Sequence, residues 1–393
     1  MTESALTPLL RDDSALDDRQ KEVVTRVAEA EYAKILSLPT DDPRDPKRKF
    51  RVEATRTELV QQPEAIESTW SANATELSRV AQLIASRELT HAFLVGAGDS
   101  LAVMIAARQL LETTIGIPCE PVQSLDFAYY MDHVVTERTL VIALSSSGVT
   151  TRTVEAALVA QHRGALTIAL TNTPGSALAE ECAEMLVIKA TRVGWPTQAS
   201  TAALALIYRL GIEVGRRRGV SRADDLDLAL SAMPETIASV ISAHEPAVAE
   251  AAEAEKSKEM YLFSAGGPNW ASAIIGAAKV RECSPNHAQA IQVEEYHHYN
   301  SQKPGEPLWI VAPAGRTVPR AVDTARDATR YGGALYVVAT EGDASFEGHA
   351  ENILYLPAVP EILSPLAYVV PVQMFGYHVA MAKFRVADRA AEA

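Results

Sequence analysis

The chain has 393 residues, and its 36 lysines and arginines against 50 aspartates and glutamates give a formal net charge of -14. This length suggests two or three domains, and a hydrophobic share of 48% with 22% charged residues excludes disorder as the main state. The acidic balance argues against a nucleic-acid partner, because nucleic-acid backbones are bound mainly through lysine and arginine. It leaves room for a local pocket that binds a small anion through hydroxyls and backbone dipoles.

The cysteines and the apolar runs indicate the cellular compartment of the protein. Cys119, Cys182 and Cys283 are scattered with no C-x-x-C pair, so neither a disulfide framework nor a zinc site is expected, and a reducing cytoplasm fits. No apolar run reaches the length of a membrane span, and the N-terminus lacks the apolar core of a signal peptide. We therefore expect a cytoplasmic protein with no membrane span, no metal and no cofactor.

In chain order, residues 1–80 come first and are mostly polar and helical in pattern, with an irregular break at Asp41–Pro46. We expect a helical N-terminal extension there. Strand-like runs alternate with helix-length segments over 81–218, and again over 259–393. The segment 219–258 between them has few strand signals and is expected to be a helical connector.

The two alternating stretches repeat one another. Four short apolar runs recur in the same order, at 93–98, 140–144, 164–169 and 185–188, and again at 261–266, 307–311, 333–338 and 353–356. The runs are rich in Val, Ile and Leu and nearly continuous, which is typical of parallel strands buried on both faces. We therefore predict an α/β fold of two similar, doubly wound domains, with one large sheet as the alternative.

A serine-rich loop follows the second apolar run of the first repeat. It reads Ser145-Ser146-Ser147-Gly148-Val149-Thr150 and precedes a helix-length segment. In an open α/β sheet, ligands lie beyond the carboxyl ends of the strands, where helix N-termini present unpaired N–H groups. Three serines with a glycine and a threonine exceed what capping alone needs, so a phosphate site is favoured over plain N-caps.

The first loop, Gly96–Leu101, also joins a strand to a helix. It fails the G-x-G-x-x-G dinucleotide motif because Leu101 stands at the third glycine position, so nucleotide binding is not expected. Ser100 offers a further donor to a sugar or phosphate. The second repeat has Pro313–Thr317 in place of the serine loop, but it carries charged and titratable residues, Lys279, Arg281, Glu282, Glu294, Glu295, His297 and His298.

These motifs together resemble the tandem sugar isomerase (SIS) domain family. The residues that carry the resemblance are Gly96–Ser100, Ser145–Thr150, Lys279-x-x-Glu282 and Glu295-x-x-His298, with similar runs at Glu58–Pro63 and Gln373–Ala380. The similarity covers most of residues 55–383. It is nearest to the isomerase portion of glucosamine-6-phosphate synthase, to phosphosugar deaminases and to fructosamine-6-phosphate deglycases. The resemblance implies two flavodoxin-like parallel-sheet SIS domains in tandem.

The resemblance also implies roles for individual residues. Ser100, Ser145, Ser146, Ser147, Gly148 and Thr150 would surround the substrate phosphate and nearby hydroxyls, and the backbone at Val193 would line the sugar. Glu282 would move a proton between carbons 1 and 2, with Lys279 beside it, and His298 would open the sugar ring. In this family the histidine comes from the neighbouring subunit, so a homodimer with a shared active site is implied.

The sequence departs from the synthase in several places. No catalytic cysteine follows Met1, so glutaminase activity is not expected, and the tail that carries a Schiff-base lysine is missing. The usual His-Gly-Pro is His298-Tyr299-Asn300 here, and Val149 replaces a glutamate. These departures put the synthase substrate in doubt, and Trp195, Tyr296 and Trp270 are candidates for setting specificity.

Residue chemistry alone leaves some assignments open. Lys279 and Glu282 are three residues apart and share a helix face, which also fits a surface ion pair. His297 is as good a titratable group as His298, and only the family pattern favours His298. We expect a phosphosugar isomerase, deaminase or deglycase, and the alternative is a non-catalytic phosphosugar sensor or regulatory protein.

Overall fold

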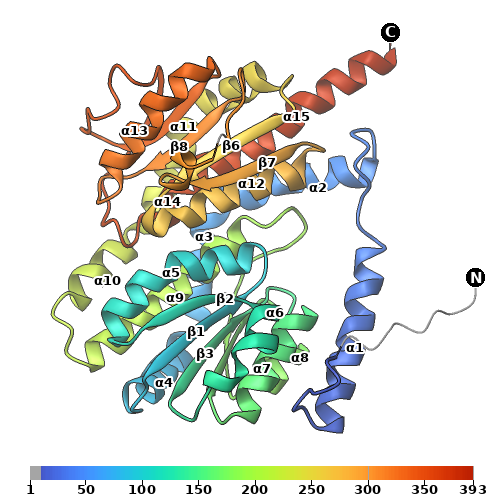
Figure 1. The fold of residues 1–393 in the computed structure, drawn as a ribbon, viewed down its shortest axis with the longest axis vertical. Helices are drawn as coiled ribbons and strands as arrows, with labels where there is room; N and C mark the ends of the chain where they lie inside the picture. The colour runs from blue at the N-terminus through green and yellow to red at the C-terminus, as the bar shows by residue number, and fades with distance from the viewer. Residues whose placement is uncertain (1–9, 300, 393) are drawn as a thin grey trace, which may run out of the picture.

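The computed structural model describes residues 10–299 and 301–392. It contains two five-stranded parallel sheets, each with helices on both faces, and the two α/β units lie one above the other in Figure 1. The predicted α/β class with two similar sheets is confirmed, and the alternative of one large sheet is wrong.

The first sheet has the strand order β2-β1-β3-β4-β5, which is the flavodoxin-like order. Its strands are β1 (His91–Gly96), β2 (Cys119–Gln123), β3 (Thr139–Leu144), β4 (Leu166–Thr171) and β5 (Glu184–Val187). All neighbouring pairs are parallel. The inner strands β3 and β4 are buried at every position, which explains their continuous apolar sequence.

The second sheet repeats this order as β7-β6-β8-β9-β10. Its strands are β6 (Met260–Ala265), β7 (His287–Gln292), β8 (Leu308–Ala312), β9 (Leu335–Thr340) and β10 (Asn352–Leu356). The sequence pattern located four strands in each unit and missed the edge strands β2 and β7. The switch point of the strand order therefore lies between β1 and β3 in the first sheet and between β6 and β8 in the second. In folds of this kind a ligand binds at the carboxyl ends of the strands that flank the switch point.

Helices cover both faces of each sheet. In the first unit α5 (Asp99–Ile115) and α9 (Gln198–Arg217) lie on one side, and α6 (Ser124–Asp126), α7 (Thr151–His162) and α8 (Ala177–Glu181) lie on the other. In the second unit α12 (Trp270–Cys283), α14 (Pro365–Tyr368) and α15 (Val370–Glu392) face the first unit or the connector, and α13 (Val318–Ala328) covers the opposite side. Short turns of π- or 3-10 helix are Phe127–Met131, Asp132–Val134, Gly267–Asn269, Glu295–His297 and Thr329–Tyr331.

The connector consists of α10 (Ala223–Ser231) and α11 (Met233–Glu255). Helix α11 packs against α15 and α3, and its Glu255 carboxylate accepts a hydrogen bond of 3.1 Å from the Tyr336 hydroxyl of β9. This part of the chain is therefore integrated into the second unit. Among the described residues no single helix is long and apolar enough to cross a membrane, and only the bent pair α10 and α11 meets that criterion, by length and composition.

The N-terminal extension reaches both units. It forms α1 (Asp18–Ile35), α2 (Pro46–Val60), α3 (Gln62–Ala72) and α4 (Ala74–Ala85). Helix α1 packs on α7 of the first unit, and α2 packs on α15 of the second (Figure 1). The break expected at Asp41–Pro46 is a turn in which Asp45 caps α2 through the Lys47 N–H at 2.9 Å.

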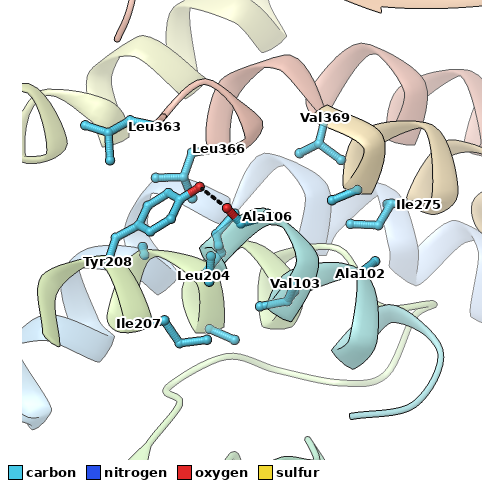
Figure 2. Packing of buried hydrophobic residues seen from close by; sticks show 14 of the residues in the cluster. Ala102, Val103, Ala106, Leu204, Ile207, Tyr208, Ile275, Leu363, Leu366 and Val369 are labelled. Atoms are coloured by element: carbon cyan, nitrogen blue, oxygen red, sulfur yellow. Dashed lines mark hydrogen bonds between the residues drawn. The ribbon is translucent and has the colours of Figure 1, made fainter. Parts of the chain in front are cut away.

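An apolar layer joins the two units. Figure 2 shows it between α5 and α9 of the first unit and α12 with the α14 region of the second, with the side chains Val103, Leu204, Ile275, Leu366 and Val369 packed together. The buried Tyr208 hydroxyl donates to the Ala106 carbonyl at 3.3 Å, so its polar atom is satisfied inside the layer. This packing fixes α12, which carries the catalytic candidates Lys279 and Glu282, relative to α5, which carries the binding candidate Ser100.

Candidate active site

The serine loop lies at the carboxyl end of β3, at the switch point of the first sheet. The Ser145 side chain is buried, its Oγ lies 2.9 Å from Thr150 Oγ1, and it accepts the Gly148 N–H at 3.1 Å. The Ser146 hydroxyl donates to Asn172 Oδ1 at 2.9 Å. The loop is thus held in shape by hydrogen bonds of its own hydroxyls, one of them to Asn172.

Gly148 is required for the shape of this loop. Its φ is +65°, in the left-handed region that favours glycine. A Cβ at this position would lie 1.8 Å from the Ser176 hydroxyl oxygen. The backbone of the loop therefore approaches its neighbour more closely than any other residue type allows.

The N-terminus of α7, directly after the serine loop, is occupied by a carboxylate from the N-terminal extension. Glu31 of α1 accepts the Thr151 N–H at 3.1 Å and the Thr151 hydroxyl at 2.6 Å. A carboxylate at this place satisfies an orphan N–H and the positive end of the helix dipole. No sequence pattern pointed to Glu31, because 120 residues separate it from its partner.

The loop after β1 brings Asp99 to the start of α5. Gly96 ends β1, and a Cβ there would lie 2.8 Å from the backbone carbon of Ser100, so the first turn of α5 packs directly on the strand end. Ser100 is half-buried in that turn, as the next residue after Asp99.

A buried ion cluster links the two units at this point. Lys279 of α12 is fully buried, and its Nζ lies 2.7 Å from Asp99 Oδ2 and also contacts Glu282 Oε2. Burial lowers the pKa of Lys279, but the charges of Asp99 and Glu282 outweigh it, so the pKa is raised and the ammonium stays charged. Burial also raises the pKa of Glu282, more than the Lys279 charge lowers it, and the Asp99 charge raises it further. Two carboxylates therefore share one ammonium.

A cavity of about 650 Å³ opens beside this cluster. It lies between the units, and its lining includes Gly98 and Asp99 from the first, Glu282 and Arg281 from the second, and Trp195 from the segment after β5. Glu282 keeps 28% of its side chain exposed. A partly exposed carboxylate with a raised pKa, in a cavity of substrate size, has the properties of a general base.

Arg48 of α2 fixes the end of the helix that carries Glu282. The Arg48 side chain is almost fully buried, and it donates to the carbonyls of Glu282 at 3.2 Å and Cys283 at 3.4 Å. Its Nε donates to the Thr40 carbonyl at 2.7 Å. The N-terminal extension therefore positions α12, which the sequence alone did not reveal.

The structure separates the two candidate histidines. His297 uses both ring nitrogens, Nδ1 at 3.0 Å from Asp327 and Nε2 at 3.0 Å from Thr324, and only 13% of its side chain is exposed. His298 keeps 60% of its side chain exposed and contacts Glu294 at 3.1 Å. Within this chain His298 does not line the cavity that contains Glu282.

Other predicted site residues also lie outside that cavity. The serine loop is not part of its lining. Arg192, which is also outside the lining, donates from Nη1 to the Ser146 carbonyl at 2.9 Å. The Val193 side chain is exposed, and its N–H donates to Glu58 at 2.6 Å, so its contact with a sugar stays a prediction. Of the three aromatic candidates for setting specificity, only Trp195 lines the cavity that contains Glu282. Trp270 lines a neighbouring pocket, and the Tyr296 hydroxyl donates a hydrogen bond to Gln302 Oε1.

Comparison with known proteins identifies the first unit. Residues 84–211 match the family model of the SIS domain, and this range contains the whole first sheet with the serine loop. The chain therefore contains a SIS domain at residues 84–211. Among curated relatives it is 29% identical over 342 residues to a glutamine–fructose-6-phosphate aminotransferase (isomerizing) of Thermus thermophilus, covering 84% of this chain and 56% of that protein. The chain thus spans about half the length of the curated relatives it matches.

Solved structures extend the SIS-type fold over both units. The C-terminal domain of glucosamine-fructose-6-phosphate aminotransferase from Francisella tularensis aligns with a TM-score of 0.75 and 21% identity, over 84% of this chain and 96% of that one. Glucosamine-6-phosphate deaminase from Thermotoga maritima aligns with a TM-score of 0.64 and 18% identity, over 84% and 94%. At these identities the likeness establishes the fold, two SIS-type units in tandem, and leaves the reaction to the site.

Proposed function

We propose that this SIS-domain protein is an enzyme that moves a proton between carbons 1 and 2 of a sugar 6-phosphate or amino-sugar 6-phosphate, as an isomerase, deaminase or deglycase. The observation that carries the proposal is Glu282, a partly exposed carboxylate of raised pKa that shares the buried Lys279 with Asp99 beside the inter-unit cavity. A base of this kind suits the formation of an enediol, because its protonated and ionised forms lie closer in free energy near neutral pH.

The serine loop would hold the phosphate. Ser145, Ser146, Ser147 and Thr150 supply hydroxyls around the backbone bend at Gly148, and Ser100 lies in the first turn of the neighbouring helix. The relatives named after phosphosugar reactions support this class of substrate. The sugar would extend from the loop past Arg192 and Trp195 toward Glu282.

The decisive experiment separates binding from turnover. The native protein is incubated with a panel of sugar 6-phosphates and amino-sugar 6-phosphates, and products are identified by NMR. Glu282→Gln is expected to abolish turnover and to keep the dissociation constant of the sugar phosphate, whereas Ser145→Ala weakens binding. Unchanged turnover in Glu282→Gln would contradict the assignment of Glu282 as the base. If the native protein binds a sugar phosphate but forms no product, the alternative of a non-catalytic phosphosugar sensor is favoured.

The site is further proposed to be completed by His298 of a second copy, in a cytoplasmic homodimer. In support, His298 is exposed on its own chain and lies outside the cavity with Glu282. Glu282→Gln and His298→Ala, each inactive alone, are mixed in equal amounts and allowed to exchange subunits. A shared site regenerates one native site in the mixed dimers, which gives about a quarter of native turnover. No recovery, with exchange verified by mass-tagged subunits, contradicts the shared site.

A further inference from the structure

Gln373 of α15 is a buried glutamine whose side-chain amide has no partner among the described residues. Only 1% of the residue is exposed, and both Oε1 and Nε2 are buried without a hydrogen bond to another described residue. Gln373 begins the run Gln373–Ala380 that resembles the SIS family, but the proposed chemistry does not use it. Buried amide groups without a partner are costly and rare, so this side chain indicates a small ligand.

A small cavity lies against this amide at the boundary between the two units. It is enclosed by α5 and α9 of the first unit and by α12, α14 and the start of α15 of the second, within the apolar layer of Figure 2. Its volume of about 10 Å³ matches the roughly 10–15 Å³ that one water molecule needs. Most of its wall is apolar, and the polar residues in the wall are Gln373, Ser200, Thr201 and Ser272.

Two hydroxyls in this wall can accept a hydrogen bond. The Ser200 hydroxyl donates to Asp99 Oδ2 at 3.4 Å, and the Ser272 hydroxyl donates to Asn269 Oδ1 at 3.0 Å. A hydroxyl has one proton, so an oxygen that has donated it can still accept. The cavity therefore offers a donor and an acceptor from the Gln373 amide together with acceptor oxygens from two serines.

This set of groups fits a water molecule and not a metal cation. A water can accept from Gln373 Nε2, donate to Gln373 Oε1 and donate its second proton to a serine hydroxyl, which gives the three hydrogen bonds typical of buried water. A bare cation is held by oxygen atoms alone and would leave Nε2 unpaired. The cavity is also too small for any sugar or buffer molecule.

The cavity is connected to the ion cluster of Asp99, Lys279 and Glu282 on two sides. Ser200 links the cavity wall to the same Asp99 oxygen that contacts Lys279. One turn after Gln373, Gly376 allows α15 to approach α12 so closely that an added Cβ would lie 2.6 Å from the Lys279 Cβ. A change at Gln373 is therefore expected to reach both sides of the contact between Asp99 and Lys279.

We propose that Gln373 binds one ordered water molecule between the two units, and that this water, through Ser200, positions Asp99 against Lys279. Gln373 is then a positioning residue, because it acts through the ion cluster and does not touch the substrate. The water site itself is independent of the reaction. Its effect on catalysis rests on the proposed function, since that effect takes Glu282 as the base.

The water site is tested first, by a high-resolution crystal structure of the native protein. We expect a water within about 3.2 Å of the Gln373 amide and of the Ser200 or Ser272 hydroxyl. Gln373→Met fills the space of the amide with an apolar group and should expel this water, whereas Ser200→Ala should keep it. A dry cavity in the native protein, or an amide paired directly with another side chain, overturns the site.

The positioning role is tested by the pH dependence of kcat and KM. The Asp99 charge raises the pKa of Glu282, so an Asp99 that moves away from the cluster lets this pKa fall. Gln373→Met should therefore lower kcat about tenfold at nearly unchanged KM and move the acid limb to lower pH. Ser200→Ala cuts the link between the water and Asp99, so it should move the limb in the same direction, and it serves if Gln373→Met does not fold.

A matched control separates positioning from a general loss of stability. Gln20 of α1 is also a buried glutamine, and its Oε1 accepts the Asp17 N–H at 3.1 Å, far along the chain from the cavity. Gln20→Met should lower the free energy of unfolding and leave the acid limb in place. Gln373→Asn keeps an amide beside the cavity and should retain more of the native kcat than Gln373→Met.

The outcomes distinguish this inference from the proposed function. If the native protein turns over no sugar phosphate, the proposed function falls, and the crystal structure alone decides the water site. If the water is present but the acid limb stays in place in both Gln373→Met and Ser200→Ala, the positioning role is overturned. The same holds if Gln20→Met moves the limb as far as Gln373→Met does.

Discussion

The ammonium of Lys279 lies 2.7 Å from the carboxylate of Asp99, and the two residues belong to different α/β units. Lys279 is fully buried, only 13% of the Asp99 side chain is exposed, and the same ammonium contacts Glu282. The contact therefore does two things. It ties the first turn of α5 to α12 across the unit boundary, and it sets the charge around the proposed base.

Removing the ammonium is expected to destabilise the protein. Lys279→Met leaves two carboxylates facing each other in a buried place, and breaking a buried ion pair from one side costs about 3–5 kcal/mol. Urea denaturation measures the free energy of unfolding. The control is Lys49→Met, because Lys49 forms an exposed pair with Asp388 at 3.2 Å, which is worth about 1 kcal/mol or less. Equal losses in the two variants would show that Lys279 is not a clamp between the units.

The raised pKa of Glu282 predicts the acid limb of the pH–rate profile. The base acts in its ionised form, so kcat/KM falls as pH drops through the folded-state pKa, which lies above the ordinary glutamate value of about 4.3. Lys279→Met removes a charge that lowers this pKa, so the limb moves to higher pH. The assignment of Glu282 as the base is contradicted if kcat/KM of the native enzyme falls at the ordinary glutamate pKa. It is also contradicted if the acid limb of Lys279→Met moves to lower pH.

The same shift predicts a stability difference with a defined sign. Because the folded-state pKa of Glu282 lies above its unfolded value, the folded state binds more protons between the two values. Stability contributed by the protonated carboxyl is present below the unfolded pKa and is lost as pH rises through the folded pKa. The unfolding free energy of the native protein minus that of Glu282→Gln should therefore fall as pH rises through this window, and a flat difference contradicts the prediction.

The sequence pattern predicted the inner strands and one edge strand of each sheet, and it missed the other edge strand, β2 or β7. Runs such as Val141–Leu144 are buried on both faces and therefore continuously apolar. The edge strands Cys119–Gln123 and His287–Gln292 contain partly or fully exposed positions and polar residues, so they did not register as strands. An edge strand has one sheet neighbour and open surroundings, so its sequence need not be apolar, although the edge strands β5 and β10 keep the apolar runs by which they were predicted.

The site was predictable only where its residues are neighbours in sequence. Lys279 and Glu282 share one helix face three residues apart, and Ser145 to Thr150 form one loop. The contact of Lys279 with Asp99 joins positions 180 residues apart, and no local pattern specifies it. Arg51 of the N-terminal extension was missed for the same reason, since its contact with the Trp195 ring joins positions far apart in the sequence.

Gly148 should tolerate no side chain. Gly148→Ala combines a positive φ, which costs a residue with a Cβ about 1–2 kcal/mol, with a Cβ placed 1.8 Å from the Ser176 hydroxyl. We expect the loop to shift and the dissociation constant of a sugar phosphate to rise about tenfold or more, measured by calorimetry.

The companion variants for Gly148 separate strain from steric conflict. Gly116→Ala has a similar φ of +76° at the end of α5 with nothing within 4 Å of the added Cβ, so it should lower stability without weakening binding. Adding Ser176→Gly to Gly148→Ala relieves the conflict and should restore part of the affinity. Full affinity in Gly148→Ala alone would show that the loop does not hold the phosphate.

Glu31 provides the last prediction, because it places a carboxylate from the N-terminal extension on the first turn of α7. Glu31→Ala leaves the Thr151 N–H without its acceptor and removes a favourable charge at a helix N-terminus, together worth about 1 kcal/mol. Glu31→Gln keeps an oxygen acceptor and should cost less, while Glu29→Ala, at an exposed position of the same helix, should cost almost nothing. Urea denaturation ranks the three variants, and limited proteolysis should find α1 cut faster in Glu31→Ala because it loses its contact with α7. If Glu31→Ala and Glu29→Ala behave alike in both measurements, the contact does not anchor the extension to α7.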